Sequence, residues 1–253
     1  MQSNSVLYEQ QGAVVLLTLN EPEKLNALSV NIREGLENSF AKIADDDSVR
    51  VVVITGAGKK SFCAGADIST LKFEPMYVKR FLDSILDTLA IGERCRKPVI
   101  CAVNGFAFGG GLELAIGSDF IIASERATFG VPEINIGLLP GFAVVRLGDI
   151  IGRQKAKEMS MLGEAISAQE AKELGMVLEV VPHEEVVAKA MELAEKIAAK
   201  PQPAVQLAKA IYNRELGGEE LQYAKDAMPF LFLTDDGKEG VTAFMEKRKP
   251  KFL

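Results

Sequence analysis

The sequence predicts an α/β core followed by a mainly helical C-terminal part. Two observations lead to this fold class: short apolar stretches alternate with amphipathic segments of helical period up to Gly141, and helical segments dominate after it. Strands that are apolar along their whole length are typical of a sheet covered on both faces. The 253 residues, of which 48% are apolar and 25% charged, can bury a sizeable core without disulfides or metals.

Strand and helix signals alternate in the first half of the chain. Residues 13–19 are β-branched and apolar and end at the turn signal Asn20-Glu-Pro. Asn31 and Glu34 resemble a capping box that opens a helix. Further strands are expected at 50–55, 99–103 and 119–123, and further helices at 78–89 and from about residue 112.

After Gly141 the pattern is mainly helical. One strand is expected, at 176–181, with helices at 153–162, 168–174, 184–199 and over most of 203–231. Internal repetition is limited to recurring strand-strand-helix units. A proline-rich junction at 199–203 divides the chain into a core, residues 1–198, and a helical region, residues 199–253.

The charge balance and the termini exclude several classes of protein. A net charge of −6 argues against a protein that coats nucleic acid. The basic stretch 246–251 is more typical of a solvated tail than of a binding site. Residues 1–10 carry no targeting signal, and no apolar run of about 18 residues predicts a membrane span.

The inventory of nucleophiles and metal ligands is small. Cys63, Cys95 and Cys101 form no Cys-x-x-Cys pair, which favours reduced thiols in a cytoplasmic protein, and Cys101 is expected to be buried. The single histidine, His183, disfavours histidine metal sites and histidine-dependent triads, and its position indicates a surface or capping role. Acid-base chemistry would therefore fall to carboxylates.

The sequence matches none of three common motifs that contain glycine. The segment from Gly56 to Ser61 lacks the first glycine of a P-loop, because Val53 stands there. The run Gly109-Gly-Gly111 does not continue as a dinucleotide-binding loop, because position 114 is Leu. The chain has no Gly-x-Ser-x-Gly nucleophile elbow.

Two glycine-centred loops can present backbone N–H groups. The run 109–111 opens a helix, where free N–H groups can bind an anion or a developing oxyanion, although a tight strand-to-helix turn is an equal alternative. Residues 62–68, Phe-Cys-Ala-Gly-Ala-Asp-Ile, follow another strand and also permit close backbone approach. If the two strands are neighbours, the loops can each supply one donor to a single oxygen.

Two carboxylates lie in apolar surroundings. Glu113 has Leu112, Leu114 and Ala115 beside it, and Glu133 lies in the apolar loop 129–134. Such surroundings raise a carboxyl pKa, as a general acid requires. The alternatives are a favourable charge at a helix start for Glu113 and a buried carboxylate bound by backbone amides for Glu133.

The ordered set of motifs resembles the enoyl-CoA hydratase (crotonase) family over nearly the whole chain. Each motif alone is weak, and their order makes the resemblance specific. The matching segments are residues 19–28, 61–68, 97–114, 129–134, 137–141 and 234–240.

The resemblance implies a spiral of repeated ββα units and a two-glutamate hydratase. It implies that the backbone N–H groups of Ala66 and Gly110 hold the thioester oxygen. It further implies that Glu113 takes a proton from water and that Glu133 supplies one to the α-carbon, in a reversible syn hydration of 2-enoyl-CoA. No metal or redox cofactor is expected, because coenzyme A is part of the substrate.

The resemblance also implies how coenzyme A and other subunits bind. The nucleotide end of CoA is expected near Lys24, Leu25, Ala64, Asp67 and Ile68, with Phe244 and Lys247 approaching from a neighbouring subunit. The helical region 199–253 is expected to form a homotrimer, or a hexamer as a dimer of trimers.

The chain departs from the family pattern after Pro140-Gly141. The family has a glycine-rich stretch there, whereas residues 142–145 are Phe-Ala-Val-Val, which is bulkier and one residue shorter. Three hypotheses follow: an enoyl-CoA hydratase; a dehydratase, isomerase or hydrolase for another acyl-CoA, such as a branched or cyclic one; or a non-catalytic binding protein of this fold. Retention of both glutamates argues against the third.

Overall fold

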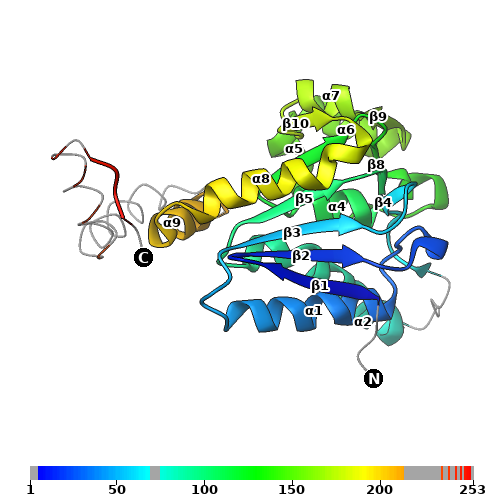
Figure 1. Ribbon diagram of the computed structural model, residues 1–253. Helices are drawn as coiled ribbons and strands as arrows, with labels where there is room; N and C mark the ends of the chain where they lie inside the picture. Colours follow the sequence, from blue (N-terminus) through cyan, green and yellow to red (C-terminus); the bar gives the residue numbers. More distant parts are fainter. Residues whose placement is uncertain are drawn as a thin grey trace.

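The computed structural model describes residues 5–68 and 75–213, with residues 235, 239, 243, 246 and 248–251. Within these ranges the chain forms a six-stranded sheet and a four-stranded sheet with helices packed around them (Figure 1). The α/β architecture expected for the core is therefore confirmed.

The larger sheet has the order β1-β2-β3-β5-β7-β10. Its edge strand β1 is antiparallel to β2, and the remaining neighbours are parallel. Helical connections join the parallel strands, as parallel pairing requires. The strands are β1 (Val6–Gln11), β2 (Val14–Leu19), β3 (Val51–Gly56), β5 (Val99–Val103), β7 (Phe120–Ser124) and β10 (Glu179–Val181).

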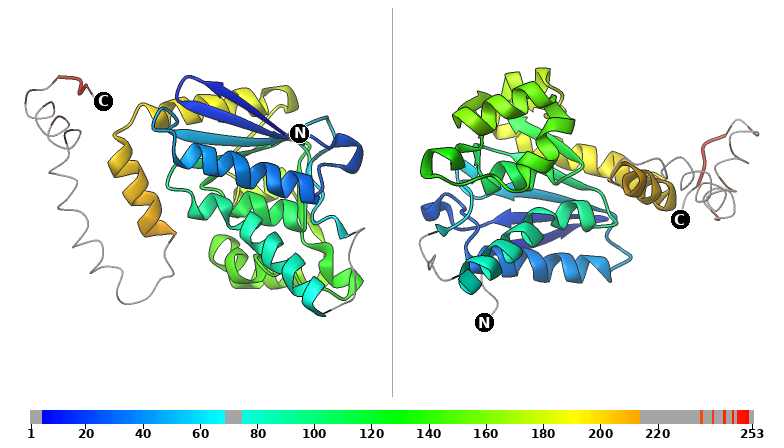
Figure 2. Two further views of the ribbon diagram at one scale, coloured as in Figure 1. Left: turned by 90° about the horizontal axis from the view of Figure 1, so that it is seen from below. Right: turned by 180° about the vertical axis from the view of Figure 1, so that it is seen from behind.

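Both faces of the larger sheet are covered, because its strands are apolar on both sides. In β3, Val52 and Ile54 belong to one buried cluster, whereas Val51 and Val53 belong to another. Helix α8 (Val186–Ala198) packs on the second face, and α1 (Val30–Ala44) lies across the first (Figures 1 and 2). The sequence alternation of strands and helices thus corresponds to a doubly covered sheet.

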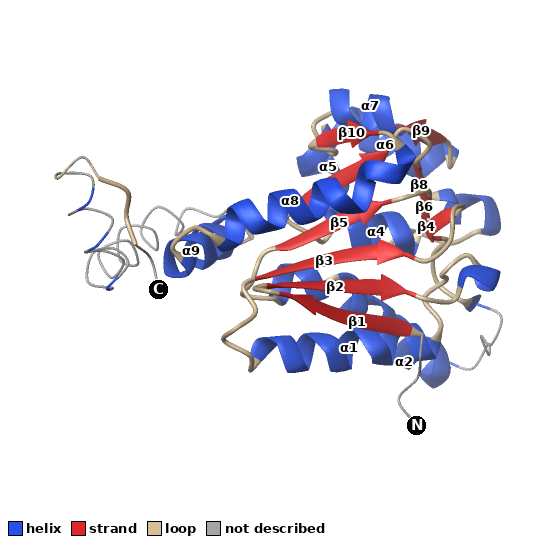
Figure 3. Ribbon diagram, viewed as in Figure 1, coloured by secondary structure: helices blue, strands red, loops and turns tan. Residues whose placement is uncertain are grey.

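The smaller sheet lies at the right-hand end of the larger one in Figure 3 and has the order β4-β6-β8-β9. Its strands are β4 (Ser61–Cys63), β6 (Phe106–Phe108), β8 (Thr128–Gly130) and β9 (Ala165–Ser167). β4, β6 and β8 run parallel, and each follows directly on β3, β5 or β7 of the larger sheet. In each strand-strand-helix unit, the first strand therefore joins the larger sheet and the second joins the smaller one.

The remaining helical segments connect the strands or extend from the core. They are η1 (Pro22–Lys24), α2 (Pro75–Leu89), α3 (Ile91–Arg94), α4 (Gly110–Ile116), η3 (Pro132–Ile136), α5 (Ala143–Ile151), α6 (Arg153–Leu162), α7 (Ala168–Glu173), η4 (His183–Glu185) and α9 (Gln202–Tyr212). The helices α2, α4, α6, α7 and α9 fall in expected ranges, η4 lies at the start of one, and η1, α3, η3 and α5 were not expected.

Three local expectations are wrong. The cap of α1 is Ser29 rather than Asn31, because the Ser29 Oγ accepts the Ile32 N–H at 3.2 Å. A second strand, β9, follows Gly141 where only one was expected. The strand expected at 176–181 is limited to β10, because the N–H groups of Met176 and Val177 turn back to the Ala171 carbonyl at the end of α7.

Helix α9 is tied to the core by a buried lysine. The Lys209 Nζ donates to the carbonyls of Gly92 and Lys97 and pairs with Asp119 at 2.7 Å. The helix expected over most of 203–231 is present as α9 up to Tyr212, and residues 214–231 of the expected range lie outside the described residues. In the part of the chain described here, none of the helices has the length and apolarity to cross a membrane.

Candidate active site

The candidate site lies at the carboxyl ends of the three parallel strands of the smaller sheet. Ala66 follows the end of β4 by three residues, Gly110 follows the end of β6 by two, and Glu133 follows the end of β8 by three. Parallel strands end at the same edge of a sheet, where ligands of α/β proteins bind. The topology therefore brings together three segments that are far apart in the sequence.

The loops after β4 and β6 touch through their backbones. A Cβ on Gly111 would overlap the Cys63 carbonyl oxygen and lie 3.0 Å from the Cys63 Cβ. A Cβ on Gly110 would lie 3.3 Å from the Ala66 nitrogen, and one on Gly65 would lie 3.4 Å from the Gly110 nitrogen. Only small residues permit this approach, which explains the glycines in both loops.

The same contact brings two N–H donors side by side. Among the described residues, neither the Ala66 N–H nor the Gly110 N–H has a hydrogen-bond acceptor. The Leu28 N–H donates to the Gly65 carbonyl at 2.8 Å, which fixes the loop that carries Ala66. The expected pairing of these two amides is compatible with an oxyanion hole, whose donors must be fixed before charge develops.

Glu113 lies on α4, one turn after Gly110, and is 4% exposed. Its Oε1 accepts the N–H groups of Phe142 and Ala143, each at 2.8 Å. Burial raises the pKa of the Glu113 carboxyl, and the two N–H bonds oppose that rise by stabilising the carboxylate. The structure thus holds Glu113 in one orientation with stabilising donors for its charged form.

Glu133 lies on η3 against the glycine run. A Cβ on Gly109 would overlap the Glu133 Oε1 and lie 3.3 Å from its Cδ. The Oε2 atom is buried and has no hydrogen-bond partner among the residues that the structure describes. Burial raises the pKa of the Glu133 carboxyl to about 7; a hydrogen bond from its own backbone N–H opposes the rise, and the nearby Glu113 charge adds to it.

The two carboxyls therefore have different preferences. Burial raises both pKa values, but Glu113 accepts two N–H bonds that favour its ionised form, whereas Glu133 accepts one from its own backbone and its Oε2 has no partner among the described residues. Two carboxyls whose surroundings separate their proton affinities are suited to act as base and acid. This arrangement is compatible with the roles that the resemblance implies, Glu113 as base and Glu133 as acid, which stay a prediction.

The residues expected to bind CoA form a surface beside Ala66. The Ala64 N–H donates to the Leu25 carbonyl at 3.1 Å, which joins the segment of Lys24 and Leu25 to the loop after β4. Lys24, Leu25 and Ile68 are exposed, and Ala64 and Asp67 are partly so. Phe244 and Lys247, expected from a neighbouring subunit, lie outside the described residues.

Asn26 holds this surface in place. The residue is fully buried and its φ is 55°, in the left-handed region. Its Oδ1 accepts the Glu21 N–H, and its Nδ2 donates to the carbonyls of Ala57 and Ser61. The side chain thereby links the turn at residues 21–26 to the start of β4.

Sequence reasoning missed the backbone donors to Glu113 and the individual role of Gly109. Phe142 and Ala143 are 29 and 30 residues from Glu113, so no local pattern indicates their contact. The signal for Gly109 was present as the first member of a glycine run. Its φ of 52° and its contact with Glu133 distinguish it from Gly110 and Gly111.

Other candidate nucleophiles have structural roles. Cys63 and Cys101 are buried, which raises the pKa of each thiol to about 12, so the expected burial of Cys101 is confirmed. His183 opens η4, and its Nδ1 lies 3.3 Å from the buried Ser124 Oγ. The His183 contact joins η4 to the end of β7 and lies apart from the three loops.

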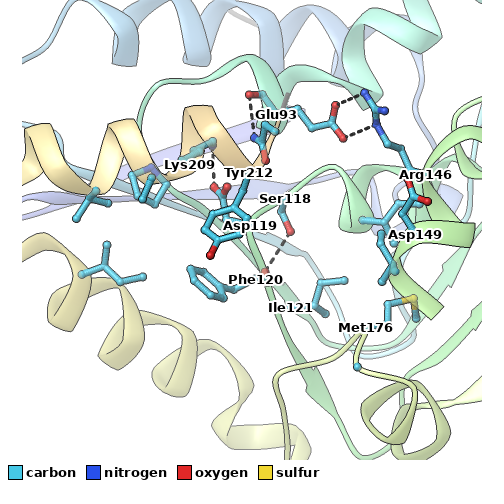
Figure 4. Close-up of a pocket in the computed structure, with 18 of the residues that line it drawn as sticks. Glu93, Ser118, Asp119, Phe120, Ile121, Arg146, Asp149, Met176, Lys209 and Tyr212 are labelled. Atoms are coloured by element: carbon cyan, nitrogen blue, oxygen red, sulfur yellow. Dashed lines mark hydrogen bonds and ion pairs between the residues drawn. The ribbon is translucent and has the colours of Figure 1, made fainter. Parts of the chain in front are cut away.

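A cavity of about 970 Å³ lies elsewhere, between β7, α5 and α9 (Figure 4). Neither of the two glutamates nor the amides of Ala66 and Gly110 line it. Four of its charged side chains are bound to each other, as Lys209–Asp119 and Arg146–Glu93 pairs. We therefore assign the candidate site to the carboxyl edge of the smaller sheet rather than to this cavity.

Known proteins resemble the chain over its whole length. The profile of the family described as enoyl-CoA hydratase/isomerase matches residues 9–253. A short-chain-enoyl-CoA hydratase of Clostridium acetobutylicum is 40% identical, over 98% of this chain and 97% of that protein. A crotonyl-CoA hydratase of Syntrophomonas wolfei is 37% identical, over 100% of this chain and 99% of that protein.

A solved structure has the same fold. The crystal structure of an enoyl-CoA hydratase from Bacillus anthracis matches with a TM-score of 0.93 and 39% sequence identity, covering 98% of this chain and 99% of that one. The expected crotonase-type fold is thereby confirmed. Sequence and structure together show that the chain belongs to the enoyl-CoA hydratase/isomerase family.

Proposed function

We propose that this enzyme catalyses the reversible syn addition of water to a 2-enoyl-CoA, giving a 3-hydroxyacyl-CoA. One observation carries the proposal. Two carboxyls in different surroundings, Glu113 and Glu133, lie at the same sheet edge as two backbone N–H groups that have no acceptor among the described residues. The hydratases named above, which match this chain over almost its full length, support the same reaction.

The proposed mechanism assigns one task to each group. The amides of Ala66 and Gly110 bind the thioester oxygen and stabilise the negative charge that develops there. Ionised Glu113 takes a proton from water while the water oxygen forms a bond to the β-carbon. Protonated Glu133 then gives its proton to the α-carbon, and the C=C bond becomes a single bond.

The amides are expected to supply a large part of the rate acceleration. Removal of one oxyanion donor from other enzymes costs about 3–4 kcal/mol of barrier. Ala66 and Gly110 donate through the backbone, so side-chain substitution cannot delete them. A substitution at either position acts instead through displacement of the loop.

We propose that the reaction needs no metal or redox cofactor, since it consists of proton transfers, addition of the water oxygen to the β-carbon and stabilisation of the developing charge, with no electron acceptor or donor required. Coenzyme A enters as part of the substrate and lies along Lys24, Leu25, Ala64, Asp67 and Ile68. Their partial exposure beside Ala66 supports this placement.

We also propose that the protein is a cytoplasmic homo-oligomer, a trimer or a dimer of trimers. In this assembly Phe244 and Lys247 of a neighbouring subunit approach the CoA. Residues 1–198 form the catalytic core, and residues 199–253 form the trimerisation region. Helix α9 is the part of that region whose docking on the core is described.

The test follows the loss of enoyl-thioester absorbance over a panel of acyl groups of different length and of branched or cyclic shape. Glu113→Gln and Glu133→Gln should each lower hydration by orders of magnitude while circular dichroism shows an intact fold. Near-parental turnover in either variant would refute the two-carboxyl mechanism. Absence of hydration across the panel, with turnover of another acyl-CoA, would favour a different reaction at the same site.

A further inference from the structure

The N-terminal end of α5 uses Glu113 as its cap. Helix α5 has no side-chain cap of its own, although its first N–H groups need acceptors. The Glu113 Oε1 accepts from Phe142 at the cap position and from Ala143 at the first helical position. The orientation of the Glu113 carboxylate therefore depends on where the start of α5 is held.

The Phe142 side chain holds the start of α5 in place. It is 8% exposed, and its Cζ would lie 3.5 Å from a Cβ on Gly117, at the end of the helix that carries Glu113. The Phe142 ring therefore packs against the C-terminal end of α4. Its own backbone N–H bonds Glu113 on the same helix, so Phe142 contacts α4 at two points.

Arg146 covers the Phe142 ring from the next turn of α5. The guanidinium carbon lies 5.9 Å from the ring centroid, within the range of a cation–π interaction. Glu93 on α3 binds this guanidinium at both ends, with Nε–Oε1 and Nη2–Oε2 distances of 2.9 and 3.1 Å (Figure 4). The side chains of Arg146 and Glu93 are 30% and 20% exposed, so the pair is partly shielded from water.

We propose that Phe142 is a positioning residue for Glu113, held between Gly117 and the Arg146 guanidinium that Glu93 binds. This inference rests on the proposed function, in which Glu113 acts on water. It also gives a physical role to the bulky segment 142–145, where the family pattern is glycine-rich. Because its ring packs on α4, Phe142 restricts the movement of the Phe142 and Ala143 amides more than a glycine-rich segment would.

The test compares Phe142→Ala with Phe40→Ala. Phe40 is 7% exposed on α1, so both changes remove a phenyl ring of similar burial. Both should destabilise the fold by similar amounts. Phe142→Ala should lower kcat for enoyl-CoA hydration about 10- to 100-fold with KM within about twofold, because it displaces a group that acts in the transition state. Phe40→Ala should leave kcat near the parental value.

Hydrogen exchange of the Ala143 amide gives a second measurement that does not depend on turnover. In Phe142→Ala this amide should exchange about tenfold faster or more than in the parent and in Phe40→Ala. Arg146→Ala should change kcat and exchange in the same direction by a smaller amount, because the ring keeps its contact with Gly117.

The outcomes separate the positioning role from the proposed reaction. The positioning role is overturned if kcat of an active parent is unchanged in Phe142→Ala, or if Ala143 exchange in Phe142→Ala matches that in Phe40→Ala. If the parent hydrates no enoyl-CoA, the proposed function fails, and the exchange measurement alone decides the role of Phe142.

Discussion

Gly109→Ala should displace the Glu133 carboxyl and lower the rate of hydration while it destabilises the fold only moderately. The new Cβ would overlap the Glu133 Oε1 and lie 3.3 Å from its Cδ, so the carboxyl must move by roughly 1 Å to reach normal contact distance. A misplacement of that size in a reacting group costs about 100-fold in rate. Because the end of the side chain can rotate away, the fold itself loses only the cost of a non-glycine residue at φ 52°, about 1–3 kcal/mol.

The matched control for this variant is Gly12→Ala. Gly12 has a φ of 60° in the turn between β1 and β2, and a Cβ there would have no neighbour within 4 Å. Both variants should shift the urea midpoint to similar extents, whereas only Gly109→Ala should lose hydration of a 2-enoyl-CoA. Equal kcat values in the two variants would refute the contact between Gly109 and Glu133 as a determinant of catalysis.

Three further predictions concern protonation and burial. Hydration should fall as pH rises above about 7, because burial raises the Glu133 pKa to about 7 and the reaction needs its proton; a rate that increases steadily to pH 9 would contradict this assignment. Glu133→Gln should raise the melting temperature at pH 8 and much less at pH 5. The folded-state pKa of Glu133 is about 7, above the ordinary 4.5, so the parent protein loses stability as pH rises from about 4.5 through 7, and the glutamine variant does not. Scanning calorimetry at pH 5 and pH 8 measures the difference. Lys209→Met should cost about 3–5 kcal/mol in urea unfolding, because Asp119 then stays buried without its cation, and a loss below about 1 kcal/mol would argue against a buried pair.

Strong local patterns predicted most of the larger sheet and its helices. The apolar stretches at β2, β3, β5 and β7 are long enough to be recognised against their polar flanks. β1 was missed because Glu9, Gln10 and Gln11 are exposed at the sheet edge and give the strand a polar sequence. The strands of the smaller sheet have three residues each, which is too short for a period to appear.

The components of the site were predicted from motifs, whereas their mutual contacts were not. Ala66, Gly110, Glu113 and Glu133 came from glycine runs, apolar-flanked acids and the family resemblance. The start of α5 had no local signal, because its cap is a side chain 29 residues earlier. The hydrogen bond from the Phe142 N–H to Glu113 caps α5 without a local sequence signal, and the same bond orients the Glu113 carboxylate.

In the smaller parallel sheet, the backbone and the side chains make separate contributions to the candidate site. Its neighbouring strands are spaced about 4.8 Å apart, a distance that backbone hydrogen bonding sets whatever the side chains are. The amides that we propose to bind the thioester are thus located by main-chain geometry, and the proposed proton-transfer groups are side chains added to it. If the amides bind a thioester as proposed, replacement of the acids at positions 113 and 133 leaves those amides in place for other enolate chemistry.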